Sequence, residues 1–466
     1  MRLARRSASS GLRPAAGTWA LFTGALLRVA AFPFAQDLFG DAPVRSDLAQ
    51  AWARAPGVWW SFAKVCQFGP LPVHLEGALI HLGIPGGVGA RLIPLAFGIA
   101  GIALAARLGD RLGGAGAGAL AAWAVALSPL GIQASTTCTS EAIFLALALG
   151  TVLAALDDQP LWMALFAFGA SATRYDAWIW IPFLALWLLV RGRGSARSIA
   201  SALSLGLGPA SILLANALVL LRPLAPLIHI SRDQAHLAAL EVTRWGPWTW
   251  RAVNAVFWPA CALLALTPAL AALAARGLKK PNREAALVWL IAMVPTGIYL
   301  LRGVLLGSFL PMLRLALVPA VLLACAAGAV SRRALKRAVV VGVAFDVLLL
   351  GLAHIPGPLQ SAAAYASPVV RLPADLRAGV AAIERARGPV ALDQSSTWED
   401  IAMAHAAGRD RFALYAPVLP PARIVSICGA ALDAQLRATQ TALGERCERA
   451  GEVGRVAWWD CARPAR

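Results

Sequence analysis

Two acidic residues stand beside long apolar segments, where a carboxylate could do acid or base chemistry. Asp41 follows the segment 36–40, just after the first apolar run, and Glu141 follows the small polar run 133–140. A carboxylate in such a place can take the proton from an attacking hydroxyl group. Both also have a structural interpretation, Asp41 as a turn or capping residue and Glu141 as an acid that stabilises a helix start.

Basic residues at similar places could bind an anion. Arg174 lies in a short charged junction beside Asp176, and Arg314 lies inside an apolar run. Arg232 and His236 are four residues apart, so a helix would place them on one face. A guanidinium group suits a phosphate because of its planar, two-pronged shape. The alternatives are an Arg174–Asp176 pair that joins two helix ends, an ordinary polar loop around Arg232, and an Arg314 that extends to the membrane surface.

The composition places these residues in a membrane protein. Of the 466 residues, 59% are hydrophobic and only 14% are charged, whereas a soluble domain has roughly a quarter charged residues. The net charge of +18 could indicate a nucleic-acid partner. Most Arg and Lys residues, however, stand in short clusters between apolar runs, which is how a membrane protein sets its orientation. The composition therefore argues against a soluble enzyme and against nucleic acid as a partner.

Eleven apolar segments can be interpreted as membrane-spanning helices. They cover residues 17–36, 88–106, 116–135, 141–156, 161–173, 177–190, 198–221, 252–275, 285–301, 308–330 and 338–355. The fifth and sixth are short and by length alone could be one broken helix or a re-entrant pair. Counting them separately places four basic connections on the cytoplasmic side, with the N-terminus. The sequence thus predicts a multi-pass protein of the cell (inner) membrane with an extracytoplasmic C-terminal part.

The chain is expected to form two domains. Residues 1–355 would form the transmembrane domain, with long outer loops at 37–87 and 222–251 that contain helix-like pieces near 47–55 and 70–82. Residues 356–466 would form a small soluble α/β domain. Its strand-like runs are 390–392 and 423–427, and its helical stretches lie near 373–387 and 429–449.

Three cysteines stand in this C-terminal part, and an extracytoplasmic location favours disulfides. A straight helix between Cys428 and Cys447 would hold them about 27 Å apart, far beyond the span of a disulfide. The segment from Cys447 to Cys461 contains Gly451 and Gly454. It can turn back as a hairpin or as a helix–strand return. We therefore predict a Cys447–Cys461 disulfide that stabilises the C-terminal domain.

The order of these pieces resembles the GT-C glycosyltransferases, in particular the branch of the protein mannosyltransferases and the aminoarabinose lipid A transferase. The resemblance covers roughly residues 17–330 and the layout of the C-terminal part. It is carried by Gly40-Asp41, Gly69-Pro70-Leu71-Pro72, Gly89-Ala90-Arg91-Leu92-Ile93-Pro94, Leu127-Ser128-Pro129, Ser140-Glu141, Arg174-Tyr175-Asp176 and Arg314-Leu315-Ala316-Leu317-Val318-Pro319. Two features depart from the family. Ala42 follows Asp41 where the family often has Glu, and two separated prolines replace a Pro-Pro pair.

The resemblance implies an integral-membrane enzyme that moves a sugar from a polyprenyl-phosphate donor to an extracytoplasmic lipid, glycan or protein, with inversion at the sugar carbon. Asp41 would be the catalytic base, with Asp47 in reserve, and Glu141 would orient the acceptor or neutralise an arginine. The residues expected to hold the donor phosphate are Arg174, Arg232, His236 and Arg314. The supporting residues would be Arg91, Tyr175 and Asp176.

A phosphate leaving group needs little acid help, so the implied reaction requires no cofactor, although a divalent metal is compatible with it. The implied partners are the lipid-linked sugar, the lipid bilayer and the acceptor. Two other functions fit the same pattern, namely a transporter or flippase of an anionic lipid-linked substrate and an inactive envelope-assembly subunit. An outer cavity that both Asp41 and Glu141 face would favour the enzyme over both.

Overall fold

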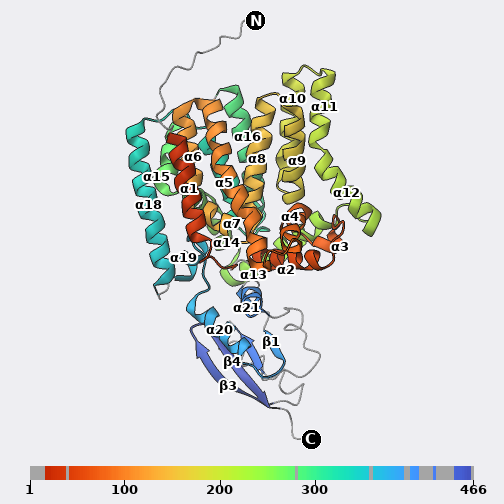
Figure 1. The fold of residues 1–466 in the computed structure, drawn as a ribbon, viewed down its shortest axis with the longest axis vertical. Helices are drawn as coiled ribbons and strands as arrows, with labels where there is room; N and C mark the ends of the chain where they lie inside the picture. The colour runs from red at the N-terminus through yellow and green to blue at the C-terminus, as the bar shows by residue number, and fades with distance from the viewer. Residues whose placement is uncertain are drawn as a thin grey trace.

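The computed structural model consists mainly of helices, with one small sheet near the C-terminus (Figure 1). It describes residues 16–37, 41–278, 282–355, 360–392, 399–408, 423–426 and 446–462. Several features singled out in the sequence lie outside these residues, namely Gly40, Cys428 and most of the predicted helical stretch 429–449.

The predicted apolar segments form helices that run side by side in a bundle (Figure 1). These are α1 (Ala16–Ala31), α5 (Gly86–Gly113), α6 (Ala115–Ala126), α7 (Pro129–Thr136), α8 (Glu141–Leu156), α9 (Pro160–Thr173), α10 (Ala177–Arg191), α11 (Ala196–Leu205), α12 (Leu207–Leu220), α14 (Pro247–Leu266), α15 (Pro268–Gly277), α16 (Arg283–Leu300), η1 (Leu301–Leu305), η2 (Leu313–Ala316), α17 (Leu317–Cys325) and α18 (Arg332–His354). Every residue of α8 is buried, so this helix forms the centre of the bundle.

Length and apolar composition identify the helices that can cross a membrane. Within the described residues, α5, α14 and the continuous α16–η1 helix are long enough, and the bent pairs α6–α7 and α11–α12 raise the number to five if each pair is one span. Five further apolar helices have 10–17 residues. Each of the eleven predicted segments coincides with one of these helices or with α15 or α18. The chain is a helical polytopic membrane protein.

Several predicted spans are interrupted at residues that favour the start or the end of a helix. Ser128 caps α7 by accepting a hydrogen bond from the Gly131 backbone nitrogen, and Pro129 takes the first helical position. The chain bends by 57° there and by 48° at Gly206, between α11 and α12. The spans predicted over 116–135 and 198–221 therefore each consist of two helices joined at a bend, and the one predicted over 252–275 is divided between α14 and α15. The separate helices predicted at 161–173 and 177–190 are α9 and α10.

Four helices outside the bundle lie at its end nearest the C-terminal domain (Figure 1). They are α2 (Asp41–Arg54), α3 (Phe62–Val65), α4 (Pro70–His81) and α13 (Ala225–Trp245), and they occupy the two predicted outer loops. Close packing fixes α2 against α4. A Cβ atom added at Gly77 would lie 2.7 Å from the Trp52 ring. This layer lies beside the C-terminal domain, which also contacts the bundle directly, since Gln133 of α7 donates to the carbonyl oxygens of Tyr365 and Ser367.

The C-terminal domain combines α19 (Gln360–Ala366), α20 (Ala374–Glu384) and α21 (Glu399–Ala406) with a four-stranded sheet. The strands are β1 (Val390–Leu392), β2 (Arg423–Ser426), β3 (Arg446–Val453) and β4 (Val456–Ala462), in the order β1-β2-β4-β3. Only β1 and β2 are parallel. The domain has its own apolar core, as the α/β prediction requires. The predicted helix 429–449 was wrong over 446–449, which belong to β3.

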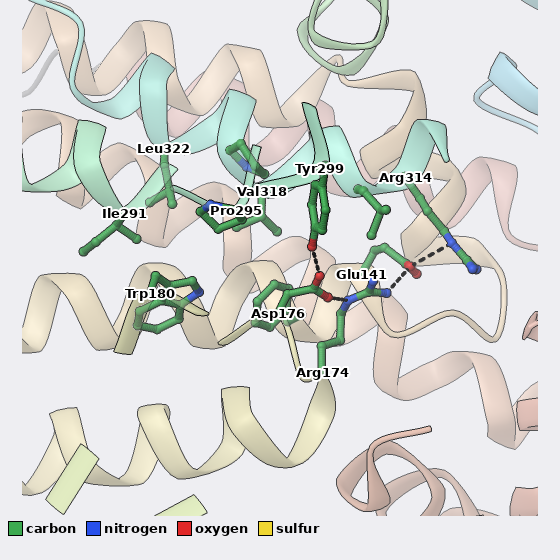
Figure 2. Close-up of a pocket in the computed structure, with 13 residues that line it drawn as sticks. Glu141, Arg174, Asp176, Trp180, Ile291, Pro295, Tyr299, Arg314, Val318 and Leu322 are labelled. Carbon is green, nitrogen blue, oxygen red and sulfur yellow. Dashed lines mark hydrogen bonds and ion pairs between the residues drawn. The ribbon is translucent and has the colours of Figure 1, made fainter. Parts of the chain in front are cut away.

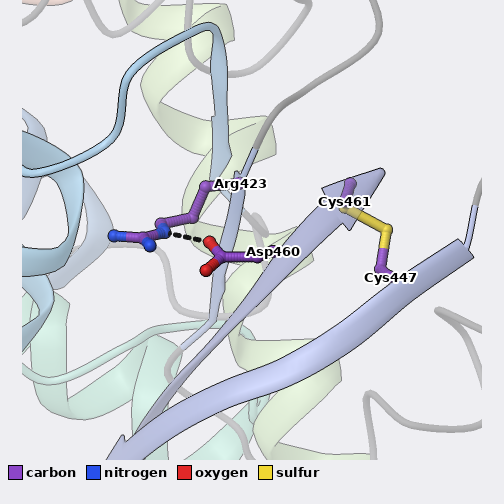
Figure 3. The surroundings of a disulfide bond; sticks show 4 residues. All are labelled: Arg423, Cys447, Asp460 and Cys461. Carbon is purple, nitrogen blue, oxygen red and sulfur yellow. Dashed lines mark hydrogen bonds and ion pairs between the residues drawn. A yellow bond between two sulfur atoms is a disulfide. The ribbon is translucent and has the colours of Figure 1, made fainter. Parts of the chain in front are cut away.

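The predicted Cys447–Cys461 disulfide is present and joins β3 to β4 (Figure 3). The two cysteines face each other in the antiparallel register, with Cα atoms 4.0 Å apart. Gly454 adopts a positive φ of 58° in the turn between the strands, a conformation that glycine adopts readily. The structure therefore selects the hairpin from the two returns that the sequence allowed.

The ends of the bundle give a prediction about orientation. The connection between α10 and α11 lies at the end of the bundle opposite the C-terminal domain (Figure 1), and the basic Arg191, Arg193 and Arg197 stand in or beside it. Because basic loops stay in the cytoplasm, we expect a reporter fused after residue 195 to be cytoplasmic and one fused after residue 360 to be extracytoplasmic. Alkaline phosphatase and fluorescent-protein fusions test this. Finding both reporters on one side would contradict the proposed orientation.

Candidate functional site

Arg174 is the centre of a charged network (Figure 2). The network lies at the end of the bundle where α4 contacts α9. Arg174 follows the last residue of α9 in extended conformation. Its Nε donates to Asp176 Oδ2 at 2.7 Å, and its Nη1 donates to Glu141 and to Ser140 Oγ. The Tyr299 hydroxyl, from α16, donates to the other oxygen of Asp176. Three parts of the bundle are thus joined through one guanidinium group.

Arg314 extends this network to Asp41. Its Nη2 lies 2.6 Å from Asp41 Oδ2, and its Nε lies 3.6 Å from Glu141 Oε1. Asp41 is the first residue of α2 and Glu141 the first residue of α8. The two acids singled out in the sequence are therefore bridged by one arginine. Arg314 has counter-ions within the protein, so the alternative in which it only reaches for the membrane surface does not describe it.

Glycine allows α4 to approach this network. A Cβ atom at Gly69 would come within 2.2 Å of the Thr173 carbonyl oxygen, a contact that no other residue type tolerates. Pro70 then starts α4 at its first helical position. The Gly69-Pro70 pair therefore places the start of α4 directly against the end of α9, next to Arg174.

A cavity of about 410 Å³ opens beside the network, within the size range of small-molecule sites. Part of its lining is charged and includes Asp41, Arg45, Arg174, Asp176 and Arg314. Another part is apolar and aromatic and includes Phe68, Trp178, Leu227, Ile230, Ile298 and Phe309. A ligand with an anionic group and a hydrocarbon part would match both parts of the lining.

Glu141 lines a smaller pocket next to this cavity (Figure 2). The smaller pocket shares Arg174, Asp176, Tyr299 and Arg314 with the larger cavity. Asp41 and Glu141 thus face adjoining spaces, and Arg314 stands between them. Tyr175, predicted as a supporting residue, also lines the larger cavity.

The structure does not bring Arg232 and His236 to this cavity. Both are exposed on α13, whose cavity-lining residues include Ile230, Ser231 and Gln234. The helix does form an ion pair at four-residue spacing, but it joins His229 to Asp233. The helical period decides this, because the residues that line the cavity recur every three or four positions and 232 and 236 fall between them.

Asp47 and Arg91 also lie outside the set of cavity-lining residues. Asp47, whose side chain is 46% exposed, accepts a hydrogen bond from His405 of the C-terminal domain. Arg91 donates to the carbonyl oxygens of Phe32, Ala35 and Thr136. Phe32 and Ala35 follow the end of α1, and Thr136 is the last residue of α7. Arg91 therefore holds the ends of these two helices together.

Sequence reasoning missed Arg45, Glu76 and Tyr299. Arg45 stands one helical turn after Asp41 on α2, is 4% exposed and lines the cavity. Its four-residue spacing from Asp41 was the available signal. Glu76, on α4, is fully buried, and burial raises the pKa of its carboxyl group to about 8 although the charge of Arg45 opposes this. No sequence pattern marked Tyr299, which lies within the apolar α16.

Metal ligation is not evident at the site. Within the described parts of the chain, no group of three or more His, Cys, Asp or Glu side chains is arranged to hold a metal ion. The expectation that the reaction requires no cofactor stays a prediction.

His405 connects the C-terminal domain to α2 and to the segment after α1. Its Nδ1 lies 3.1 Å from Asp47 Oδ1 and its Nε2 lies 3.9 Å from Asp37 Oδ2. Burial alone would lower the pKa of His405, but the hydrogen bond to Asp47 and the charges of both carboxylates outweigh it and raise the pKa. His405 therefore binds its proton more tightly in the docked state.

This linkage predicts that docking of the C-terminal domain weakens as pH rises. The His405 contribution should be complete below about pH 6.5, its ordinary pKa, and should be lost as pH rises through the raised pKa of the docked state. Hydrogen exchange of α21 at pH 6 and pH 8.5 measures the effect. We expect lower protection factors, which are corrected for the intrinsic pH dependence of amide exchange, at the higher pH, and a weaker pH dependence of protection in His405→Gln.

The control for this experiment is His229→Gln, which removes a histidine–aspartate pair from the exposed face of α13 and should keep the wild-type pH dependence. Equal protection of α21 in wild-type protein at both pH values would contradict the role of His405.

Comparison with solved structures identifies the fold. The chain matches the apo crystal structure of ArnT from Cupriavidus metallidurans with a TM-score of 0.57 and 14% identity, over 96% of this chain and 98% of ArnT. Two structures from Archaeoglobus fulgidus each match with a TM-score of 0.47. One is an oligosaccharyltransferase in complex with zinc and sulfate, at 14% identity over 88% of this chain and 67% of that chain. The other is the oligosaccharyltransferase AglB with an inhibitory peptide and a dolichol-phosphate, at 15% identity over 88% of this chain and 69% of that chain.

No family model and no curated protein matches the sequence. The match to ArnT covers nearly the whole of both chains, so the predicted GT-C fold is confirmed over the membrane bundle and the C-terminal domain together.

Proposed function

We propose that the protein is an integral-membrane glycosyltransferase that transfers a sugar from a polyprenyl-phosphate donor to a hydroxyl group of an extracytoplasmic acceptor. The observation that carries this proposal is the cavity itself, whose lining combines Asp41, paired with Arg314, with further arginines and apolar side chains. A base, a set of anion-binding groups and an apolar surface are what a lipid-phosphate sugar and a hydroxyl acceptor require. The ArnT-like fold supports the same class of reaction.

Asp41 is the proposed general base. The acceptor hydroxyl oxygen forms a bond to the anomeric carbon of the sugar, and its proton passes to the Asp41 carboxylate. The bond between the anomeric carbon and the phosphate oxygen breaks, and its electron pair stays on that oxygen. The products are the glycosylated acceptor and a polyprenyl phosphate that carries one more negative charge than the donor phosphate did. Attack opposite the leaving group inverts the sugar carbon.

The ion pair between Asp41 and Arg314 couples proton transfer from the acceptor to the departure of the phosphate. In the structure Arg314 Nη2 is held by Asp41. When Asp41 takes up the proton it becomes neutral, and the positive charge of Arg314 is then no longer balanced by Asp41. That charge becomes available as the leaving phosphate gains negative charge, which is where electrostatic stabilisation lowers the barrier. Glu141 keeps Arg314 and Arg174 in place by contacting both.

A donor panel tests the proposal. Purified protein in sealed proteoliposomes is supplied with polyprenyl-phosphate sugars that differ in the sugar, and with candidate lipid, glycan and peptide acceptors. We expect release of free polyprenyl phosphate that depends on an acceptor and is absent without the protein. A flippase would move the donor between leaflets without releasing it, and an assembly subunit would do neither. Transbilayer movement with no release from any donor would therefore reject the transferase.

A further inference from the structure

Arg45 is a buried cation whose hydrogen-bonding capacity is unused. Its side chain is 4% exposed, and its Nε and Nη1 atoms have no hydrogen-bond partner among the described residues. Its guanidinium group lies 4.5 Å from the centre of the Phe68 ring and forms part of the cavity wall. Buried donors in folded proteins are nearly always paired, so an arginine left in this state points to a partner that arrives from outside.

The charges around the cavity show what that partner must be. Asp41, Glu141 and Asp176 carry three negative charges, and the arginines bound to them, Arg174 and Arg314, carry two positive charges. This network alone would repel a phosphate. Both arginines already donate to protein carboxylates, whereas Arg45 forms no ion pair with any carboxylate in the described chain. Arg45 balances the surplus negative charge of this network, and it is a cavity cation whose donors no carboxylate occupies, so an entering anion can bind to it.

The groups that face Arg45 leave its donors free. The charges of Asp41 and Glu141 act on Arg45 favourably without pairing with it. Burial raises the pKa of Glu76, its buried neighbour on α4, although the charge of Arg45 opposes this. Arg302, the other cation of the cavity without a carboxylate, already donates to the Ser308 carbonyl oxygen and lies over the Phe309 ring. Arg45 is thus the best-placed free guanidinium group for an incoming anion.

We propose that the guanidinium group of Arg45 binds the phosphate of the lipid-linked donor from the cavity wall, and that it keeps this contact as the phosphate gains charge. This inference rests on the proposed function, because it assumes that the ligand is a polyprenyl phosphate. It adds to Arg174 and Arg314 a residue that donates directly to the phosphate. A planar guanidinium group suits a phosphate.

Binding of two lipids to the purified full-length protein tests this. The probes are a polyprenyl monophosphate and the matching uncharged polyprenol, and the readout is the ratio of their affinities in nanodiscs. Wild-type protein should prefer the phosphate. Arg45→Met should lose roughly 10- to 100-fold of that preference, the scale of a charge-assisted hydrogen bond, and Arg45→Lys should lose less. A packing defect would weaken both lipids alike and leave the ratio unchanged.

The matched control is Arg54→Met, which removes an exposed arginine from the last turn of the same helix and should keep the wild-type ratio. If wild-type protein prefers the phosphate and both Arg45 variants keep that preference, the role of Arg45 is wrong while the proposed function stands. If wild-type protein does not distinguish the phosphate from the polyprenol, the proposed function fails and the role of Arg45 fails with it.

Discussion

Replacing Asp41 by Asn is expected to lower turnover about 100-fold or more, the usual scale for loss of a general base, which corresponds to about 2.7 kcal/mol of activation free energy. Asparagine keeps the size of the side chain and can still accept a hydrogen bond from Arg314 through its amide oxygen. It cannot take up the acceptor proton. The protein should therefore insert and fold normally. Acceptor-dependent release of polyprenyl phosphate measures the loss.

Asp47→Asn is the informative comparison for this variant. Asp47 pairs with His405 and does not line the cavity, so its substitution should change turnover only a few-fold. Near wild-type turnover of Asp41→Asn together with a large loss in Asp47→Asn would reverse the assignment of the base.

Arg314→Ala is expected to lower turnover about 100- to 1,000-fold, as removal of a donor that stabilises developing charge does. The loss has two causes. Asp41 is left without its ion-pair partner, whose Nη2 lies 2.6 Å from Asp41 Oδ2. The leaving phosphate is left without the nearby positive charge of Arg314. Arg314→Lys should lose less turnover, because an ammonium group keeps the positive charge. Some loss should remain, because an ammonium group contacts Asp41 and Glu141 less well than a planar guanidinium group does. The same release assay measures both variants.

Arg244→Ala serves as the control for Arg314, since Arg244 is exposed at the end of α13 and is absent from the cavity lining. It should keep wild-type turnover and membrane levels. Equal activity of the wild type, Arg314→Lys and Arg314→Ala would show that the ion pairs of Arg314 serve only the packing of the bundle.

The architecture could be read from the sequence because it depends on local patterns. A helix in lipid must satisfy its own backbone hydrogen-bonding groups, so each apolar run of sufficient length predicts a membrane-spanning helix. The same holds for the helices in the first predicted loop and for the Cys447–Cys461 disulfide, where two glycines and a short separation left few alternative pairings, although only the structure showed that the return is a hairpin. The breaks at Ser128-Pro129 and Gly206 were also encoded locally, by a capping serine, a proline and a glycine, but a count of apolar residues passes over such signals.

The sequence by itself thus determined the class of fold, the presence of a small α/β domain and the identity of several residues that meet at the site. Asp41, Glu141, Arg174 and Arg314 could be singled out because a charge beside apolar residues is costly unless it is paired or used. That cost is a property of each segment alone.

Only the tertiary structure decided which charges meet. Arg232 and Arg45 both lie on outer helices, yet the first is exposed and the second is buried at the cavity. The difference depends on the rotation of α13 and α2 about their axes, and this rotation is set by packing against helices from distant parts of the chain. Arg314 likewise reaches Asp41 only because α2 and η2 are brought together by the folded bundle. A charge pair across such a distance in sequence has no local pattern, so it exists only once the helices are packed.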